Sequence, residues 1–463
     1  MIYPLPTDFV DRIQLQYPND FALFLNALEL PNSLSLRINS EKYSQPIHLE
    51  QVPWNPHGYY TPADSVFGLD PLWHAGAYYV QEASSMFLYE LLRQHAPALH
   101  EPLVLDLCAA PGGKSTLLAE FFLPLNGWVV ANEVIPNRLS ILKENLTRWG
   151  LPNVCTTPFK PRFWSQFQNL FDLVLVDAPC SGEGLFRKDP KARLEWSNQG
   201  SYDCSVRQKD ILDEVIPSIK DQGLLIYSTC TFNPLENEGI LEYLSKTYSL
   251  DWLSIQLPLN SPVTPVGNGY AFLPHKVKGE GFFIAVARVT RKQPDMSRTF
   301  KTKAMTHNSA LKELPHPNWF EPANQASIKL LEPHTGYLFC PQLAKHYPIL
   351  HSFLPWDRIL QPITQLKGKN WAPVPESGTL LPAFKKNHVR MEVDLQQALK
   401  FIAKGDPNVS PPRKDYFVLS FKGVDLGWIK ALGNRNNNLY PLKMKLKSSK
   451  WVDPKRLPQS YFS

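Results

Sequence analysis

The feature that most constrains the fold is an alternation of short apolar β-rich runs with helical segments between residues 78 and 291. Such alternation indicates a doubly wound α/β sheet with helices on both faces. We expect strands at 103–107, 128–133, 153–157, 172–177, 223–229, 251–257 and 282–289, and helices at 114–122, 137–149, 203–220 and 236–247. The last two strands have a loop rather than a helix between them, so they are expected to form an antiparallel hairpin at the sheet edge.

The flanks of this region carry different patterns. Residues 1–77 contain a helix-like stretch and the strand-like run SLSLRINS, which predict a small N-terminal α+β module. A polar linker begins after residue 291, so we assign 292–385 to a linker and an intermediate domain. Residues 386–463 contain short alternating runs broken by Lys-Gly, Leu-Gly and Asn-rich turns, which favour a small β-barrel. A chain of 463 residues is too long for one ordinary core, which agrees with this division.

Several classes of protein are disfavoured. No apolar run reaches the roughly 18 residues of a membrane span, and the N-terminus lacks the basic start and apolar core of a signal peptide. We therefore expect a cytoplasmic protein without a membrane partner. The six cysteines form no CxxC pair and show no regular spacing, which argues against a disulfide scaffold and against a zinc site. We expect no metal ion.

The charge is concentrated at the C-terminus. Residues 385–463 hold 16 lysines and arginines against 6 acids, a net of +10, whereas the whole chain carries only +6. Aromatic residues are interleaved with these cations, among them Tyr416, Trp428 and Trp451. A basic segment with aromatics fits contact with a nucleic acid, although a solvated basic face would give a similar count.

The segment LDLCAAPGGKST places Gly112 and Gly113 between an apolar strand and a helix. In a doubly wound sheet this loop lies at the carboxyl end of the first strand, where bare backbone lets a small molecule approach closely. The loop is not a P-loop, because that motif requires a glycine where Cys108 stands, and it is not GxGxxG, which disfavours a dinucleotide. Glu133 ends the second strand, where an acid can accept hydrogen bonds from ribose hydroxyls. The two features predict a cofactor site.

Asp177 and Cys180 follow the fourth strand in DAPCSGEG, and Cys230 follows the fifth in STCTF. We expect them to converge at the same sheet edge as the glycine loop. A lone cysteine is more often a small buried hydrophobe, but two after adjacent strands favour nucleophilic chemistry. These residues alone do not rank Cys230 against Cys180. The other cysteines of the α/β region, Cys108, Cys155 and Cys204, are interpreted as structural.

These motifs occur together in a known family. CAAPGGK (108–114), DAPCSGEG (177–184) and STCTF (228–232), followed by NPLENE, resemble the Nol/Nop/Sun family of RNA cytosine-5 methyltransferases. RINS, YYVQEASSM, FRKDP and PHKVKGEGFF are similar to its branch of bacterial ribosomal small-subunit methyltransferases, and GWIKALGNRNNNLYP resembles the PUA-like C-terminal domain of that branch. The resemblance implies a Rossmann-like class I methyltransferase sheet, S-adenosylmethionine as cofactor and RNA as substrate.

The resemblance also implies a role for each matching residue. Cys230 is the nucleophile, Cys180 assists product release, Asp177 contacts the cofactor and the target base, and Glu133 holds the ribose. The methionine part of the cofactor lies against Cys108, Ala109, Ala110, Pro111, Gly112, Gly113 and Lys114. The chemistry is consistent, because carbon 5 of cytosine is a weak nucleophile until a thiolate adds to carbon 6, and a base must later remove the carbon 5 proton.

One position departs from the family pattern. After the third strand, the family has an acid within a stretch like F-D-G-R, and this chain has Lys160. The acid accepts a hydrogen bond from the adenine amino group, whereas a charged lysine cannot accept one. Loss of that contact would cost on the order of 1 kcal/mol, which weakens cofactor binding without abolishing it.

The implied partner is ribosomal RNA or the small ribosomal subunit, bound by a monomer. A transfer RNA is an alternative substrate, and an RNA-binding assembly factor with weak catalysis is an alternative class that only Lys160 supports. A DNA cytosine methyltransferase would use the Pro-Cys motif, with Cys180 as nucleophile. The Thr-Cys motif and the PUA-like tail disfavour DNA as a partner.

Overall fold

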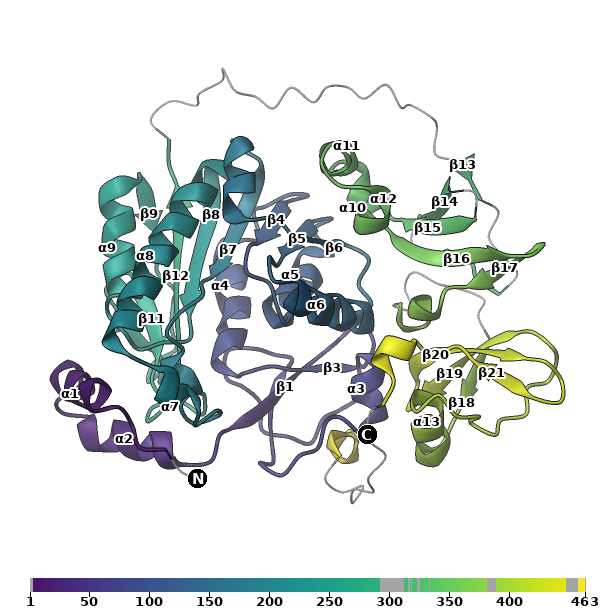
Figure 1. Ribbon diagram of the computed structural model, residues 1–463, viewed down its shortest axis with the longest axis horizontal. Coiled ribbons are helices and arrows are strands. Elements are labelled where there is room, and N and C mark those ends of the chain that lie inside the picture. The colour runs from purple at the N-terminus through teal and green to yellow at the C-terminus, as the bar shows by residue number, and fades with distance from the viewer. Residues whose placement is uncertain are drawn as a thin grey trace.

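The computed structural model describes residues 3–291, 312–314, 317, 319–322, 325–332, 334–380, 389–446 and 457–462. Within them, the largest element is a mixed nine-stranded sheet (Figure 1) of order β10–β11–β12–β8–β7–β4–β5–β6, with β9 paired to β12 beside this path. Its strands are β4 (Leu103–Asp106), β5 (Trp128–Asn132), β6 (Val154–Thr157), β7 (Phe171–Asp177), β8 (Ile219–Thr229), β9 (Leu250–Trp252), β10 (Thr264–Val266), β11 (Gly269–Phe272) and β12 (Phe282–Val289). The linker predicted directly after residue 291 lies outside the described residues.

The α/β class is confirmed. β4 pairs in parallel with β5 and β7, while β12 runs antiparallel to β8. All four residues of β4 are buried, as expected for a parallel strand covered on both faces. Two details differ from the sequence prediction. The run 251–257 forms only the short β9, and the pattern missed β10 and β11, which are three and four residues long and contain Pro265 and Gly269.

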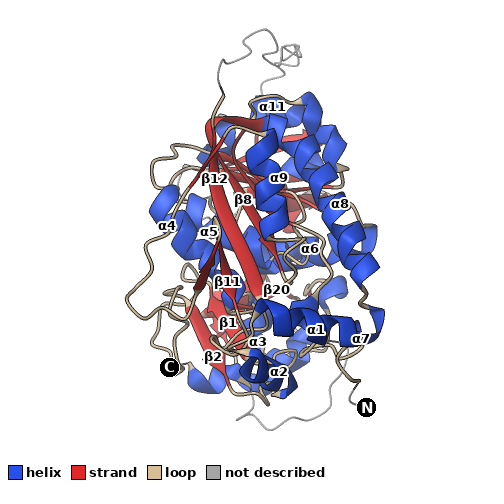
Figure 2. Cartoon of the chain, turned by 90° about the vertical axis from the view of Figure 1, so that its left-hand side faces the viewer, coloured by secondary structure: helices blue, strands red, loops and turns tan. Residues whose placement is uncertain are grey.

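Helices cover both faces of the sheet. Figure 2 shows α4 and α5 on one side of β8 and β12, and α8 and α9 on the other. α8 begins at Asn198 rather than at 203, because the Ser197 side chain accepts from the Gly200 amide and caps the helix there. It ends at Val215 rather than at 220, before β8 begins at Ile219. The helices of this region are α4 (Leu88–His95), α5 (Gly113–Phe122), α6 (Pro136–Trp149), α7 (Ala192–Glu195), α8 (Asn198–Val215) and α9 (Glu238–Thr247).

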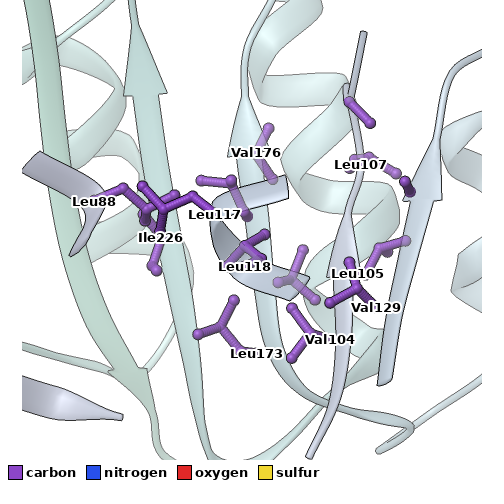
Figure 3. Packing of buried hydrophobic residues seen from close by; sticks show 14 of the residues in the cluster. Leu88, Val104, Leu105, Leu107, Leu117, Leu118, Val129, Leu173, Val176 and Ile226 are labelled. Carbon is purple, nitrogen blue, oxygen red and sulfur yellow. The ribbon is translucent and has the colours of Figure 1, made fainter. Parts of the chain in front are cut away.

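The core between α4, α5 and the sheet is aliphatic. Leu88 from α4 and Leu117 and Leu118 from α5 pack near Val104 of β4 and Ile226 of β8 (Figure 3). Each such side chain contributes about 1.5–3 kcal/mol when fully buried. This packing fixes the carboxyl ends of β4, β7 and β8, where the sequence places the candidate site.

The N-terminal module is built on a three-stranded antiparallel sheet of order β2–β1–β3. The predicted helix and strand are present as α2 and β1. β3 pairs with β1 through Tyr78 and Ile38, so this sheet extends past residue 77, the boundary that the sequence predicts. The elements are α1 (Thr7–Gln16), α2 (Phe21–Glu29), β1 (Leu34–Ile38), β2 (Gly58–Thr61), α3 (Pro71–Ala75) and β3 (Tyr78–Val80).

Two further sheets follow the linker. The intermediate region contains β13 (Lys312–Glu313), β14 (Ser327–Glu332), β15 (Thr335–Phe339), β16 (Gln361–Lys367) and β17 (Asn370–Pro373), with α10 (Pro341–Ala344), α11 (Tyr347–His351) and α12 (Trp356–Ile359). The C-terminal region contains β18 (Arg390–Glu392), β19 (Tyr416–Phe421), β20 (Val424–Ala431) and β21 (Asn436–Asn438), with α13 (Leu395–Ile402). Figure 1 shows this last sheet beside α3.

Short 3-10 turns connect several of these elements. They are η1 (Ser84–Phe87), η2 (Pro161–Gln166), η3 (Glu183–Leu185), η4 (Ile216–Ser218), η6 (Pro375–Thr379), η8 (Leu442–Met444) and η10 (Pro458–Tyr461). None of the helices in the described ranges has the length and apolar character needed to cross a membrane.

Candidate active site

The glycine loop joins β4 to α5 at the carboxyl edge of the sheet. Gly112 immediately precedes α5 and has a φ of +113°, a conformation that favours glycine. A Cβ at Gly112 would lie 3.1 Å from Leu142 Cδ1, and one at Gly113 would lie 3.3 Å from Tyr79 Cε1. The paired glycines therefore let the loop run close against its neighbours.

Lys114 and Asp177 form an ion pair at this edge. Lys114 Nζ donates to Asp177 Oδ2 at 2.8 Å, and Ser228 Oγ donates to Asp177 Oδ1 at 2.8 Å. Burial by itself lowers the pKa of Lys114, but Asp177 outweighs it and raises the pKa overall, with a further contribution from nearby Cys230. Lys114 is therefore a fixed cation at the end of the predicted cofactor loop, and its charge interacts with that of the predicted nucleophile.

Asp106, at the end of β4, is a buried acid that the sequence did not single out. Its Oδ2 accepts from Ser115 Oγ at 2.6 Å, while Oδ1 is buried and has no hydrogen-bond partner in the described part of the chain. Burial raises the pKa of Asp106 to about 7, and the charges of Asp177 and Glu133 add to the effect. An unpaired acid that lines a pocket is suited to a positively charged ligand.

Glu133 lies where the sequence predicts, immediately after β5. Its Oε1 accepts from the Ile135 amide at 2.9 Å, and Arg138 Nη1 lies 3.5 Å from its Oε2. Arg138 also donates to the Ala110 carbonyl at 2.8 Å, which connects this acid to the glycine loop. The side chain is therefore held in place beside the loop.

The structure brings the two predicted cysteines together. Cys180 Sγ and Cys230 Sγ lie 3.1 Å apart, and the Cys230 amide donates to Cys180 Sγ at 3.4 Å. The pKa of Cys180 is raised well above its usual value, chiefly because its thiol hydrogen bonds to Cys230 and also because it is buried. The two sulfur atoms are therefore in hydrogen-bond contact, and the surroundings of Cys180 favour its protonated form.

Several of these groups line one cavity of about 280 Å³. The expected residues that line it include Asp177, Cys230 and most of the glycine loop, but Glu133 and Cys180 are not among its walls. Several other lining residues were not predicted as site residues from the sequence. They include Tyr79, Gln81, Glu82, Ser85, Lys188, Glu280 and Gly281. They belong to YYVQEASSM, FRKDP and PHKVKGEGFF, so the family-like character of those segments was the available signal.

A polar network holds the part of the cavity wall that the sequence did not predict. Arg187 Nε donates to Glu280 Oε2 at 2.9 Å, and the Glu280 amide donates to Glu82 Oε1 at 3.1 Å. Glu82 also accepts from the amides of Ser84 and Ser85. Segments far apart in the sequence are thereby held on one side of the cavity.

Lys160 lies where the family pattern would have an acid, in the loop after β6. Its side chain is exposed, and the residue precedes η2. Asn132 holds the adjoining Phe159, donating to its carbonyl and accepting from its amide. The rings of Phe159 and Phe163 stack at 3.8 Å. The loop is thus ordered by Asn132 and by aromatic packing, without an acid at position 160.

Among the described residues, the remaining cysteines of this region form no hydrogen bond with the Cys180–Cys230 pair, although Cys108 lines the same cavity as Cys230. Burial raises the pKa of Cys108, and the neighbouring Asp106, Asp177 and Glu133 raise it further. Cys155 lies inside β6 and accepts from Trp128 Nε1 at 3.4 Å. Cys204 lies within α8 rather than at a helix start. A search of the described residues finds no cluster of three or more His, Cys, Asp or Glu side chains that could hold a metal ion.

Three family models match the chain in succession. They are the N-terminal domain of 16S rRNA methyltransferase RsmF over residues 5–83, 16S rRNA methyltransferase RsmB/F over 95–288, and the methyltransferase RsmF PUA domain over 388–443. The ribosomal RNA small subunit methyltransferase F of Salmonella typhi is 31% identical over 476 residues, which cover 95% of this chain and 96% of that relative. The chain belongs to the RsmB/F family. It is an RNA cytosine-5 methyltransferase that depends on S-adenosylmethionine, as the sequence motifs imply.

Solved structures agree on the fold of this RsmB/F enzyme. A methyltransferase homolog from Pyrococcus horikoshii is 26% identical with a TM-score of 0.51, over 61% of this chain and 95% of that one. NSun6 from Pyrococcus horikoshii, solved with SFG, is 20% identical with a TM-score of 0.52, over 62% of this chain and 98% of that one. The second likeness concerns the fold alone.

The residues present fit S-adenosylmethionine. The sulfonium and the amino group of this cofactor are cationic, and the buried Asp106 offers an unpaired oxygen at the cavity. Glu133 is a buried acceptor beside the loop, and Gly113 lines the cavity without a side chain. The acceptors present are therefore compatible with the cationic groups and the hydroxyls of the cofactor.

Proposed function

We propose that this enzyme methylates carbon 5 of one cytosine in 16S ribosomal RNA through a covalent adduct on Cys230. The observation that carries the proposal is the pair of sulfur atoms 3.1 Å apart, with Cys230 at the wall of the cavity that the glycine loop also lines. A binding module has no chemical need for two thiols placed in this way.

The pair of thiols supports Cys230 as the nucleophile. Hydrogen bonding to Cys230 and burial both raise the pKa of Cys180, so both favour the protonated form of Cys180. The charge of Lys114 interacts with that of Cys230. Cys230 also lines the cavity, whereas Cys180 does not. These observations favour the order that the family resemblance implies.

The reaction assigns a role to each group. The Cys230 thiolate forms a bond to carbon 6 of the cytosine, and the electron pair of the 5,6 double bond makes carbon 5 nucleophilic. The cofactor, when bound, supplies the electrophilic methyl group. Loss of the carbon 5 proton to a base then restores the double bond and expels the thiolate. We assign Asp177 to contact with the base and the cofactor, and Cys180 to the release step.

The cofactor would be held by the residues that the sequence indicates. Glu133 would accept from the ribose, and the loop from Cys108 to Lys114 would enclose the methionine part. Asp106 adds an acid toward the cationic groups of the cofactor. Lys160 removes one acceptor for adenine, which predicts a modest loss of affinity rather than inactivity.

The substrate assignment rests on the relatives. The matching curated proteins are named for the small ribosomal subunit RNA, and all three RsmF-type domains occur in this chain. The target cytosine must leave its stack so that both faces of the ring are accessible, which suits an exposed base in a structured RNA. A transfer RNA is the alternative substrate, and an assembly factor with weak catalysis is the alternative function.

A comparison of two cysteine variants tests the proposal. We expect Cys230→Ala to abolish methyl transfer to 16S rRNA while RNA binding is retained. We expect Cys180→Ala to accumulate RNA bound covalently through denaturation, because release is slowed. Cys204→Ala, at a half-buried position on α8, is the matched control and should behave as wild type. Wild-type turnover in Cys230→Ala would show that Cys230 is not the nucleophile. Methylation of transfer RNA alone would show that the substrate is transfer RNA rather than 16S rRNA.

A further inference from the structure

A second cavity, of about 260 Å³, adjoins the cavity of about 280 Å³ that Cys230 and the glycine loop line, which we call the catalytic cavity. We call it the Trp73–Arg148 pocket. It is lined by Phe67, Trp73, Gly76, Tyr78, Tyr79, Val80, Pro111, Asn145, Arg148 and Trp149. Tyr79, Val80 and Pro111 also line the catalytic cavity, so the two spaces share a wall. The second pocket is therefore a neighbour of the site where the target base reacts.

The shared wall is rigid. Tyr79 Oη donates to the Pro111 carbonyl at 3.1 Å, and Asn145 Nδ2 donates to the same carbonyl at 2.8 Å. The Tyr79 ring also packs edge-on against the Trp149 ring, with an interplanar angle of 72° and centroids 6.4 Å apart. An aromatic pocket with fixed walls can hold a planar ligand without first being ordered by it.

Arg148 places a buried guanidinium at this pocket. The residue is only 7% exposed, and its guanidinium carbon lies 4.0 Å from the centroid of the Trp73 ring. Nη1 donates to Asn145 Oδ1 at 2.7 Å, but Nε is a buried donor without a partner among the residues that the structure describes. Burial lowers the pKa of Arg148, as expected for a buried cation.

Arg37 provides a contrast. It too lies over an aromatic ring, that of Trp149, at 4.5 Å. Arg37 is neutralised by an ion pair with Glu120, and it also donates to Gln81 and Thr116. Among the described residues, Arg148 has no direct ion pair of this kind; the charge of Glu144 acts on it without a hydrogen bond, and its Nε has no hydrogen-bond partner. A buried cation without a direct ion pair is suited to an anionic ligand.

The position of the pocket indicates where that anion comes from. His74 of α3, next to Trp73, lies 3.0 Å from the Tyr440 hydroxyl of the PUA domain through its Nδ1 atom. The pocket therefore lies between the basic C-terminal domain and the catalytic cavity. An RNA strand that contacts both would pass over it, and such a strand supplies flat bases and phosphates together.

We propose that the Trp73–Arg148 pocket receives a nucleotide of the RNA substrate that flanks the target cytosine, with its base against the aromatic walls and its phosphate on Arg148. The proposal rests on the proposed function, because it assumes that RNA presents a cytosine to the adjacent cavity. It assigns to α3 and the end of α6 a direct role in substrate binding. The flanking base, unstacked when the target base flips out, would regain a stacking partner there.

Substitutions in the pocket test this role by titration with 16S rRNA prepared from cells that lack the enzyme. We expect Arg148→Gln to weaken RNA binding roughly tenfold and to reduce the salt dependence of the binding constant by about one unit of slope. We expect Trp73→Ala to weaken binding to a similar extent, and Trp73→Phe to restore most of it. The affinity for S-adenosylmethionine should not change. Arg93→Gln, at an exposed ion pair on α4, is the matched control.

A second measurement needs no variant. 16S rRNA that carries 4-thiouridine is cross-linked to the wild-type protein by light, and the modified peptides are identified by mass spectrometry. We expect a nucleotide on the peptide that contains Phe67 and Trp73. Cross-links confined to other peptides, or wild-type RNA affinity and salt slope in Arg148→Gln, would overturn the proposal. Because both experiments measure binding, a failure of methylation in the wild type would contradict the proposed function separately.

Discussion

At the scale of single residues, the arrangement of charge around Cys230 decides how the site works. Lys114 is half-buried, paired with Asp177 at 2.8 Å, and close enough to Cys230 for their charges to interact. All three residues could be singled out in the sequence, but the sequence could not show that the charge of Lys114 interacts with those of the other two. It also could not rank the two cysteines, because their separation of 3.1 Å is a property of β7 and β8 lying side by side.

The first prediction concerns Lys114. Lys114→Met removes a fixed cation whose charge interacts with that of Cys230, so attack by the Cys230 sulfur loses electrostatic support. We expect alkylation of Cys230 by iodoacetamide at neutral pH to slow on the order of tenfold, which corresponds to about 1.4 kcal/mol. Peptide mapping of the alkylated cysteine measures the rate. An unchanged rate would show that Lys114 does not act on the thiol.

The second prediction concerns the pH dependence of stability through Glu236. This carboxyl is buried, accepts from the Ser181 amide at 2.8 Å, and has its pKa raised from 4.5 to about 7, chiefly by burial. The folded protein therefore keeps a proton that the unfolded chain loses, so this group's contribution to stability is full below pH 4.5 and falls as the pH rises to 7. The loss amounts to about 3 kcal/mol.

Glu236→Gln should remove that loss. We expect its free energy of unfolding in urea to decline less than that of the wild type between pH 5 and pH 7.5. Glu242→Gln, at an exposed position on α9, is the control and should keep the wild-type slope. Equal slopes in Glu236→Gln and the wild type would mean that Glu236 is ionised throughout this range.

At the scale of elements, the sequence was most informative where strands are buried on both faces. The residues of β4, β5 and β7 form continuous apolar runs, so their positions could be predicted closely. β10 and β11 could not be found because they are short, with Pro265 and Gly269 in them. The start of α8 was missed because Gly200 weakens the helical pattern that Ser197 caps.

Contacts between distant elements could not be predicted at all. Arg12 of α1 pairs with Glu183 at 2.7 Å, and Glu183 belongs to the loop that carries Cys180. Glu183 is fully buried and also accepts from the Phe232 amide, next to Cys230. The N-terminal helix therefore supports both cysteine loops, a function that no local pattern in residues 7–16 reveals.

The third prediction follows from this ion pair. We expect Arg12→Ala to destabilise the fold by about 3 kcal/mol, because it leaves a buried carboxylate without its main cation. The double variant Arg12→Ala with Glu183→Gln should recover much of that loss. A double-mutant cycle in urea unfolding measures the coupling. Additive effects of the two substitutions would mean that the contact contributes nothing specific.

At the scale of the whole molecule, the two ends of the chain share one core. Leu36 and Tyr78 of the N-terminal module and Phe417 of the C-terminal domain belong to a single hydrophobic cluster. Phe462 packs against Tyr43 and Tyr78, and Ile47 pairs with Phe462 as an isolated bridge. The PUA domain is therefore packed against the N-terminal module, consistent with their proximity in Figure 1.

The fourth prediction tests this shared core. We expect Phe462→Ala to destabilise the protein by about 3 kcal/mol, as for other buried aromatic truncations. Hydrogen exchange should rise in both β1 and β19, because the two modules rely on the same packing. Leu442→Ala, whose side chain is 74% exposed, is the control and should change stability by less than about 0.5 kcal/mol. Faster exchange in β19 alone would indicate that the modules are independent.

The most direct test of the central claim is the identity of the residue that bonds to RNA. Cys180→Ala protein is incubated with 16S rRNA and S-adenosylmethionine, the denaturation-resistant complex is digested, and the nucleotide-bearing peptide is sequenced by mass spectrometry. We expect a methylated cytidine nucleotide on Cys230, at a single position in the RNA. A nucleotide on any other residue, or no covalent complex although the RNA is bound, would contradict the account.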